Sequence, residues 1–106
     1  MQEELLGLGL LKKSEIKKQD PDKPALKKYF MHGVGHPIGL DVHDVTLAEQ
    51  PFQEGWVLTV EPGIYLPKEG FAVRLEDDIM VTARGPVNLM ENIPIEPDDI
   101  ESLMKQ

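Results

Sequence analysis

The stretch from residue 31 to residue 44 restricts the possible folds of this chain more than any other part of its sequence. It reads MHGVGHPIGLDVHD and contains three glycines and one proline. Glycine weakens a helix and proline cannot donate the helical hydrogen bond, so a regular helix is not expected here. The stretch also contains all three histidines of the chain, His32, His36 and His43. Because the backbone bends tightly at glycines, we expect an irregular loop whose imidazoles line one cleft.

Segments typical of β-strands follow this loop. Residues 56–61 (WVLTVE) are rich in strand-forming residues and end at a Pro-Gly turn, and residues 67–70 (PKEG) predict a hairpin turn. The expected strands are residues 56–61 with 64–66 as an extension, 71–76, 79–82 after an interruption at Asp77-Asp78, and a loop or short edge strand over 85–90. The expected helices are residues 2–11, 15–18 with Ser14 as a cap, 25–30 and 97–105. This pattern predicts an α+β fold with an antiparallel sheet and short helices.

Composition and charge argue against several classes of protein. The 106 residues suit one small domain, and no apolar run approaches the roughly 20 residues of a membrane span. The 19 acidic residues outnumber the 11 basic ones, which argues against a nucleic-acid partner because phosphate binding needs a basic surface. The N-terminus lacks the features of a signal peptide, and the chain has no cysteine. We therefore expect a cytoplasmic protein that binds neither nucleic acid nor membrane.

Two glutamates occur in strands that are otherwise mostly apolar. Alternation along a strand places Glu61 on the face of Val57 and Thr59, and it places Arg74 and Glu76 on one face of the later strand. An ion pair on a solvated sheet face is one explanation of the second pattern. A hairpin would also bring Glu61 and Glu76 onto neighbouring strands, where two carboxylates repel unless a cation holds both. A divalent metal ion is the usual solution.

The histidine loop supplies a possible nitrogen ligand for such an ion. A lone histidine is more often structural than a ligand, but three among glycines favour a site. His36 with Glu61 and Glu76 would give one nitrogen and two carboxylates, which suits Zn, Mn, Co or Fe at a catalytic site with an open position. His32 and His43 would then serve as acid, base or oxyanion donor.

Three motifs, in order, resemble those of the pita-bread metallopeptidases, the creatinase and methionine aminopeptidase family. They read HGVGHPIGLDVHD, TVEPGIYLP and VRLEDDIMVT and span residues 30–82. Within this family they are most similar to the bacterial Xaa-Pro aminopeptidases (aminopeptidase P). Prolidase, which cleaves Xaa-Pro dipeptides, and a catalytically inactive pita-bread binding module are the alternatives. The resemblance implies half of a pita-bread fold and hydrolysis of an N-terminal Xaa-Pro bond by a metal-activated bridging hydroxide.

The resemblance also implies a role for each matching residue. His36 matches a metal-ligand histidine, Glu61 a ligand glutamate that also shuttles the proton, and Glu76 the glutamate that bridges two metal ions. His43 matches a histidine that contacts the substrate and stabilises the tetrahedral intermediate. His32 matches a further active-site histidine near the substrate, and Arg74 an arginine that pairs with an acidic ligand. The implied cofactor is a pair of divalent ions, with manganese first and cobalt or zinc as alternatives.

The chain departs from the family pattern in its first part. The family's two-metal site needs five ligands, and two of these are aspartates in the first half of the catalytic domain. Residues 1–106 therefore resemble the C-terminal portion of that domain, with the first half and the N-terminal domain absent. We expect one bound ion or none in this chain and no peptidase activity from it alone. The exposed sheet edge of half a pita-bread also predicts a homo-oligomer.

Overall fold

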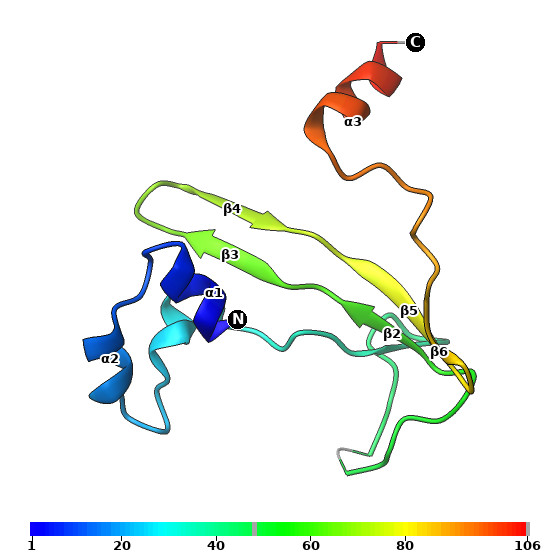
Figure 1. Cartoon of the computed structure of the whole chain (residues 1–106). Helices are drawn as coiled ribbons and strands as arrows, with labels where there is room; N and C mark the ends of the chain where they lie inside the picture. Colours follow the sequence, from blue (N-terminus) through cyan, green and yellow to red (C-terminus); the bar gives the residue numbers. More distant parts are fainter. Residues whose placement is uncertain (48, 106) are drawn as a thin grey trace. The chain divides into compact units, whose positions relative to one another are not determined.

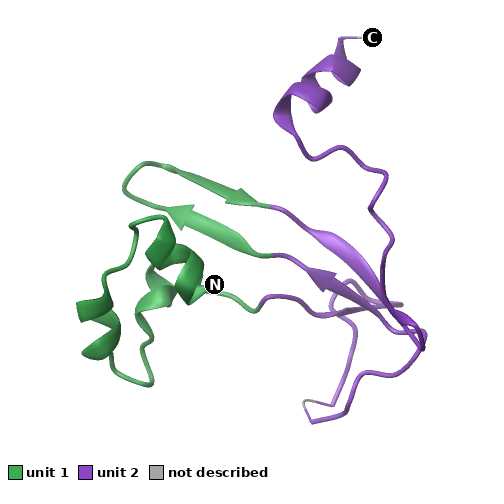
Figure 2. Ribbon diagram, in the orientation of Figure 1, with its two compact units in different colours: residues 1–33, 62–74 green, residues 34–61, 75–106 purple. Residues whose placement is uncertain are grey.

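The computed structural model describes residues 1–47 and 49–105 as an α+β structure with antiparallel sheets and short helices (Figure 1). Its elements are α1 (Gln2–Gly7), α2 (Lys13–Lys17), the 3-10 helix η1 (Ala25–Lys28), β1 (Pro37–Ile38), β2 (Val57–Val60), β3 (Gly63–Leu66), β4 (Phe71–Arg74), β5 (Asp77–Thr82), β6 (Gly85–Asn88) and α3 (Pro97–Met104). Figure 2 colours two compact units, residues 1–33 with 62–74 (unit 1) and residues 34–61 with 75–106 (unit 2). The predicted fold class is confirmed.

Unit 1 has a small apolar core where α1 and η1 meet strand β3. Leu5 is fully buried, and Leu11 and Ala25 are buried beside it. Partly buried side chains complete the cluster: Leu6, Leu10, Leu26, Tyr29 and Ile64. Four leucines of this segment thus contribute to the cluster, whereas Leu8 is 62% exposed.

The helices of unit 1 end and begin at points that differ from the prediction. α1 ends at Gly7 rather than continuing to residue 11, and the chain then turns at Gly9, whose φ of 73° favours glycine. The predicted Ser14 cap of the second helix is wrong. Lys12 occupies the N-cap position instead, and its backbone N–H donates to the Glu15 carboxylate at 2.9 Å. A glutamate at the third helical position can satisfy this exposed donor.

Strands β3 and β4 form a two-stranded antiparallel sheet in unit 1. The register runs from Gly63 opposite Arg74 to Leu66 opposite Phe71. The predicted hairpin turn at residues 67–70 joins them, and Gly70 has a positive φ of 76°. The segment predicted to extend the previous strand thus starts a separate sheet. Pro62 between them has no N–H and cannot continue a ladder.

Unit 2 contains a four-stranded antiparallel sheet in the order β1-β2-β5-β6. Asp77 and Asp78 were predicted to interrupt the return strand, but they form its first two residues and pair with Val60 and Thr59. β6 is an edge strand, and α3 follows with a proline in its first turn as predicted. In the part of the chain that the structure describes, each helix is too short to cross a membrane.

Candidate metal centre

The loop that contains His36 lies against β2 along a run of main-chain hydrogen bonds. Glu61 N donates to Val34 O at 2.7 Å, and Thr59 N donates to His36 O at 2.8 Å. Gly35 makes this close approach possible, because a Cβ atom there would collide with the carbonyl of Thr59. These main-chain contacts alone place His36 beside Glu61, without any contribution from the two side chains.

The register of β2 and β5 brings the two glutamates together. Their antiparallel pairing runs as far as Val60 opposite Asp77. One further step in the same register places Glu61 opposite Glu76, at the end of the ladder. Like charges at opposite positions destabilise a sheet unless a cation neutralises them. The sequence argument from the hairpin predicted this juxtaposition.

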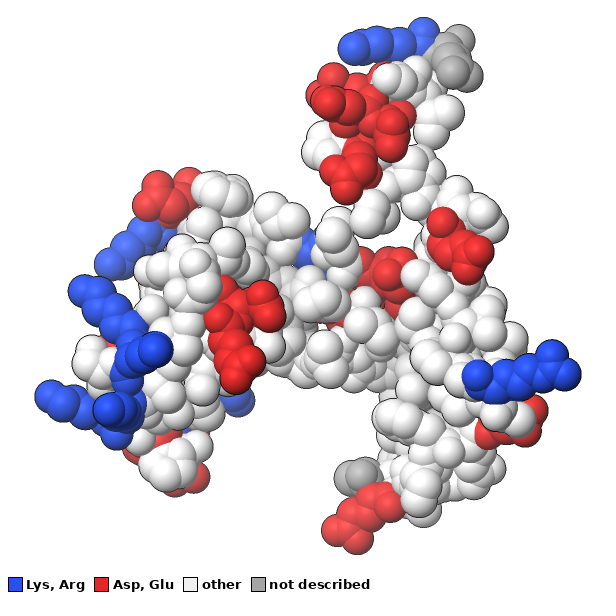
Figure 3. Space-filling view, viewed as in Figure 1, with Lys and Arg blue, Asp and Glu red and all other residues white. Residues whose placement is uncertain are grey.

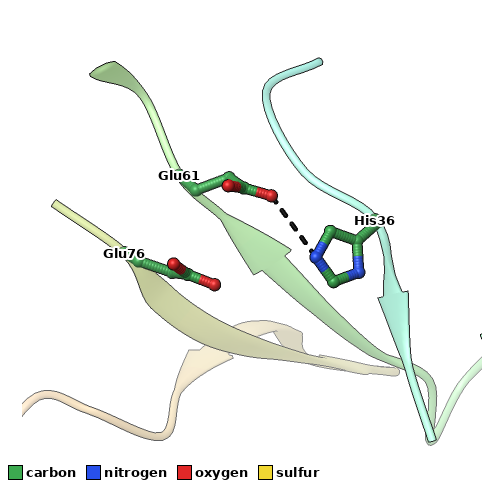
Figure 4. Close-up of side chains that lie close together, drawn as sticks. All are labelled: His36, Glu61 and Glu76. Carbon is green, nitrogen blue, oxygen red and sulfur yellow. Dashed lines mark ion pairs between the residues drawn. The ribbon is translucent and has the colours of Figure 1, made fainter. Parts of the chain in front are cut away.

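His36, Glu61 and Glu76 each offer a ligand atom, and these atoms all lie within 4.8 Å of one another. Both carboxylates point toward the side on which the imidazole lies (Figure 4), and His36 Nε2 is 3.3 Å from Glu61 Oε1. Glu61 is only 9% exposed, His36 is half-buried and Glu76 is exposed. A buried carboxylate next to an exposed one gives a site that is anchored on one side and accessible on the other.

The hydrogen bond of the His36 ring shows that this donor set fits a metal ion. Its Nδ1 atom lies 2.9 Å from the carbonyl oxygen of Pro37. A carbonyl only accepts hydrogen bonds, so Nδ1 is the donor in this contact and Nε2 is the ring nitrogen that faces Glu61. Nε2 is therefore the ring atom available as a ligand to a cation beside Glu61. Ligating histidines characteristically donate their other N–H to a carbonyl in this way.

His43 lies next to His36 in unit 2. The two ring centroids are 4.0 Å apart and the rings are tilted by 48°. A turn over residues 37–44 positions His43, with Asp44 N donating to Pro37 O at 3.1 Å. The Asp44 side chain fills the space where a Cβ at Gly39 would lie. Because His43 itself is exposed, its imidazole is available to a molecule that approaches His36, Glu61 and Glu76.

The other two predicted site residues belong to unit 1. His32 Nε2 lies 2.8 Å from the Tyr65 hydroxyl, and the His32 ring packs edge-on against Phe30 and Tyr65. Arg74 is the last residue of β4 and pairs with Gly63 in the ladder. The structure therefore brings together His36, Glu61, Glu76 and His43 in unit 2, and it holds His32 and Arg74 in unit 1.

The two units carry opposite formal charge. Unit 1 contains nine of the eleven basic residues and six acidic ones, for a net charge of +3, and its lysines are prominent in Figure 3. Unit 2 contains the other two basic residues and thirteen acidic ones, for a net charge of −11. Unit 2, which contains His36, Glu61 and Glu76, therefore carries the sign of charge that attracts cations.

Sequence reasoning missed two side chains, those of Thr59 and Tyr65, that hydrogen-bond to candidate site residues. Thr59, which is 2% exposed, was placed on the face of Glu61 but given no role. A hydroxyl two positions before a glutamate in an apolar strand could have drawn attention to it. Tyr65, the partner of His32, lies 33 positions away from it, and nothing in the sequence links the two.

A histidine and two glutamates that converge on an antiparallel α+β framework are the donor set of a metal centre. The chain belongs to Metallopeptidase family M24, whose model matches residues 6–83. Xaa-Pro aminopeptidase 3 of Homo sapiens is 40% identical over 115 residues, covering 98% of this chain and 22% of the human protein. The Xaa-Pro aminopeptidase of Escherichia coli is 40% identical over 114 residues, covering 94% of this chain and 25% of that protein.

Solved structures give the same result. Zinc-substituted aminopeptidase P of Escherichia coli, in complex with product, has a TM-score of 0.74 at 39% identity over 95% of this chain and 25% of that chain. Proline aminopeptidase P II from Yersinia pestis has a TM-score of 0.72 at 40% identity, covering 95% of this chain and 26% of its own. The resemblance and the fold predicted from the motifs are confirmed. The chain spans about a quarter of the length of these relatives.

Proposed function

We propose that this chain is the C-terminal portion of the catalytic domain of a metal-dependent Xaa-Pro aminopeptidase. The observation that supports this most strongly is the group of His36, Glu61 and Glu76, whose ligand atoms lie within 4.8 Å in a chain of a metallopeptidase family. The names of the relatives support peptides with proline in the second position as substrates. The bond cleaved would be that between the N-terminal residue and this proline.

His36 Nε2 and one carboxylate oxygen from each of Glu61 and Glu76 would hold a divalent ion. These three donors leave a coordination shell incomplete, so we propose one ion or none in this chain. The resemblance implies two ions in the full enzyme, with manganese first; cobalt and zinc are alternatives because carboxylates and an imidazole accept all three metals. When bound, the ions would lower the pKa of the attacking water and polarise the scissile carbonyl.

The residues of this chain would then handle the proton and the developing charge. Glu61, buried beside His36, would take the proton of the water and deliver it to the leaving proline nitrogen. His43 would donate a hydrogen bond to the oxyanion, an effect worth about 3 kcal/mol for one good donor. His32 would border the substrate, and Arg74 would pair with an acidic ligand, as the resemblance implies.

Two further proposals concern the surroundings of the enzyme. The lack of cysteine supports a reducing, cytoplasmic location. Self-association is supported by exposed apolar side chains on β4, where Phe71 and Val73 are 56% and 58% exposed. Both remain predictions.

A chimera tests the proposed activity. This chain would replace the matched quarter of the Escherichia coli Xaa-Pro aminopeptidase, and hydrolysis of tripeptides with proline in second position would be measured with Mn²⁺. We expect cleavage of the first peptide bond. His36→Ala should lower the rate by at least about 100-fold, because even the loss of residues around the ligands costs 10- to 100-fold.

Glu54→Gln, at an exposed position in unit 2, is the matched control and should leave the rate unchanged. A folded, metal-loaded chimera that cleaves no Xaa-Pro peptide would contradict the proposed function. Cleavage restricted to Xaa-Pro dipeptides would instead identify a prolidase.

A further inference from the structure

We propose that Thr59 is a positioning residue for the candidate metal ligands His36, Glu61 and Glu76. Its hydroxyl would fix the Glu61 carboxylate relative to His36. This inference rests on the proposed function, because it assigns Thr59 a role toward the ion that His36, Glu61 and Glu76 would hold. Thr59 is 2% exposed and lies in β2, two positions before Glu61 on the same face of the strand. Its side chain is therefore removed from water and must form its hydrogen bonds within the protein.

The Thr59 hydroxyl contacts both of the neighbouring site residues. Its oxygen accepts a hydrogen bond from His36 N at 3.0 Å. It can donate its single proton to Glu61 Oε1 at 3.4 Å or to His36 O at 3.4 Å. A hydroxyl has one proton, so only one of these two acceptors can receive it.

The competition between the two acceptors favours the carboxylate. His36 O already accepts a hydrogen bond from Thr59 N at 2.8 Å. Glu61 Oε1 is charged when ionised, and hydrogen bonds to charged oxygens are about twice as strong as those between neutral groups. A chain of donors therefore runs from His36 N through the Thr59 hydroxyl to Glu61 Oε1. Donation by His36 N polarises the hydroxyl and strengthens its own donation.

The same carboxylate oxygen faces the His36 ring. Glu61 Oε1 lies 3.3 Å from His36 Nε2, so this oxygen lies between the imidazole and the Thr59 hydroxyl. A carboxylate oxygen has more than one acceptor direction, so it can accept from Thr59 and still offer a lone pair to a cation. The hydroxyl thus connects the main chain of one candidate ligand to the side chain of another. This connection restricts the rotamers of Glu61 before an ion binds.

The test compares Mn²⁺ binding and unfolding of the chimera described above, in which this chain completes the Escherichia coli enzyme, in four forms: wild type, Thr59→Val, Thr59→Ser and Thr82→Val. Thr82 is a matched control because its hydroxyl also donates to a main-chain carbonyl, Gly85 O at 2.6 Å, and accepts from Arg84 N at 3.2 Å. It is the last residue of β5, at the opposite end of the strand from Glu76. Mn²⁺ binding would be measured by titration calorimetry and stability by urea unfolding.

We expect Thr59→Val to raise the dissociation constant for Mn²⁺ by about 10- to 100-fold, the usual effect of losing a partner of a ligand. Thr59→Ser, which keeps the hydroxyl, should bind close to wild type. Both Val variants should lose stability, but Thr82→Val should keep the wild-type dissociation constant.

Wild-type affinity in Thr59→Val would overturn the inference, as would equal weakening in Thr59→Ser or Thr82→Val. Failure of the folded wild-type chimera to bind Mn²⁺ would instead overturn the metal-site assignment itself, and this inference with it.

Discussion

Single backbone positions decide whether the candidate ligands can meet, and Gly35 is the most demanding of them. It precedes His36, and a Cβ at this position would collide with the carbonyl of Thr59, which is a main-chain atom and cannot rotate away. The loop and β2 would have to separate for any other residue to fit. Such overpacking typically costs about 1–3 kcal/mol and would also displace His36 from Glu61.

Gly35→Ala should therefore lower the free energy of unfolding by about 1–3 kcal/mol, as measured by urea denaturation. Gly7→Ala is the matched control, because a Cβ at Gly7 meets nothing within 4 Å and the residue is in α1. It should leave stability unchanged or raise it by up to about 1 kcal/mol, since alanine is the better helix former. Equal stability of the two variants would show that the loop does not approach β2 as described.

At the residue scale, the sequence identified the candidate ligands but not their supports. His36, Glu61 and Glu76 were recognisable because each is a metal-binding type of residue in an unusual setting, a glycine-rich loop or an apolar strand. Thr59 is common in strands, so its type gave no indication of a role. The contact of His36 Nδ1 with Pro37 O depends on a ring orientation that spacing cannot predict.

At the scale of elements, hydrophobic pattern and turn residues located most strands and helices but not their limits. The strand predicted at residues 56–61 and the turn at 67–70 are present. Asp77 and Asp78 suggested an interruption because aspartate is uncommon in strands, yet pairing with β2 overrides that preference. Ser14 suggested a cap by residue type alone, whereas Glu15 reaches the free N–H of Lys12.

The start of α2 yields a prediction about pH. Glu15 accepts from Lys12 N at 2.9 Å and from Lys28 Nζ at 2.6 Å. The Lys28 hydrogen bond, followed by that of Lys12, lowers the pKa of the Glu15 carboxyl, and the same bond raises the pKa of Lys28. Glu15 therefore stabilises the fold above its unfolded-state pKa, and this contribution is lost as the pH falls through the folded-state value. The contribution of Lys28 is lost as the pH rises through its raised pKa.

Glu15→Gln should thus lower the melting temperature slightly at neutral pH, and the difference from wild type should shrink as the pH falls into the range where Glu15 protonates. The effect is small because both side chains are solvent-accessible and screened. Thermal unfolding followed by circular dichroism between pH 3 and 8 would measure it. Glu54→Gln, exposed in unit 2, should show no such pH-dependent difference. A difference that grows toward acid pH would have the wrong sign for this ion pair.

At the scale of the molecule, each unit is assembled from two separate stretches of chain. Unit 1 combines residues 1–33 with 62–74, and unit 2 combines residues 34–61 with 75–106. A reading along the sequence predicts a single small domain, because neither composition nor linkers mark a boundary at residue 34, 62 or 75. The concentration of negative charge in unit 2 also becomes visible only after this division.

The chain alone should show no measurable Xaa-Pro cleavage with Mn²⁺, because three ligands leave the proposed site incomplete. The assay would follow release of the N-terminal residue from proline-containing tripeptides by chromatography. His43→Ala is the control that separates true activity from contamination. Cleavage by the wild-type chain that disappears in this variant would contradict the prediction.

The placement of Glu61 opposite Glu76 has a consequence for folding itself. An ion held by both carboxylates would join β2 and β5 at the end of their ladder, so metal content and resistance to unfolding would rise and fall together. Chelation would then loosen the pairing of β2 and β5 from that end, and His36, Glu61 and Glu76 would lose their arrangement together with part of the rigidity of the sheet.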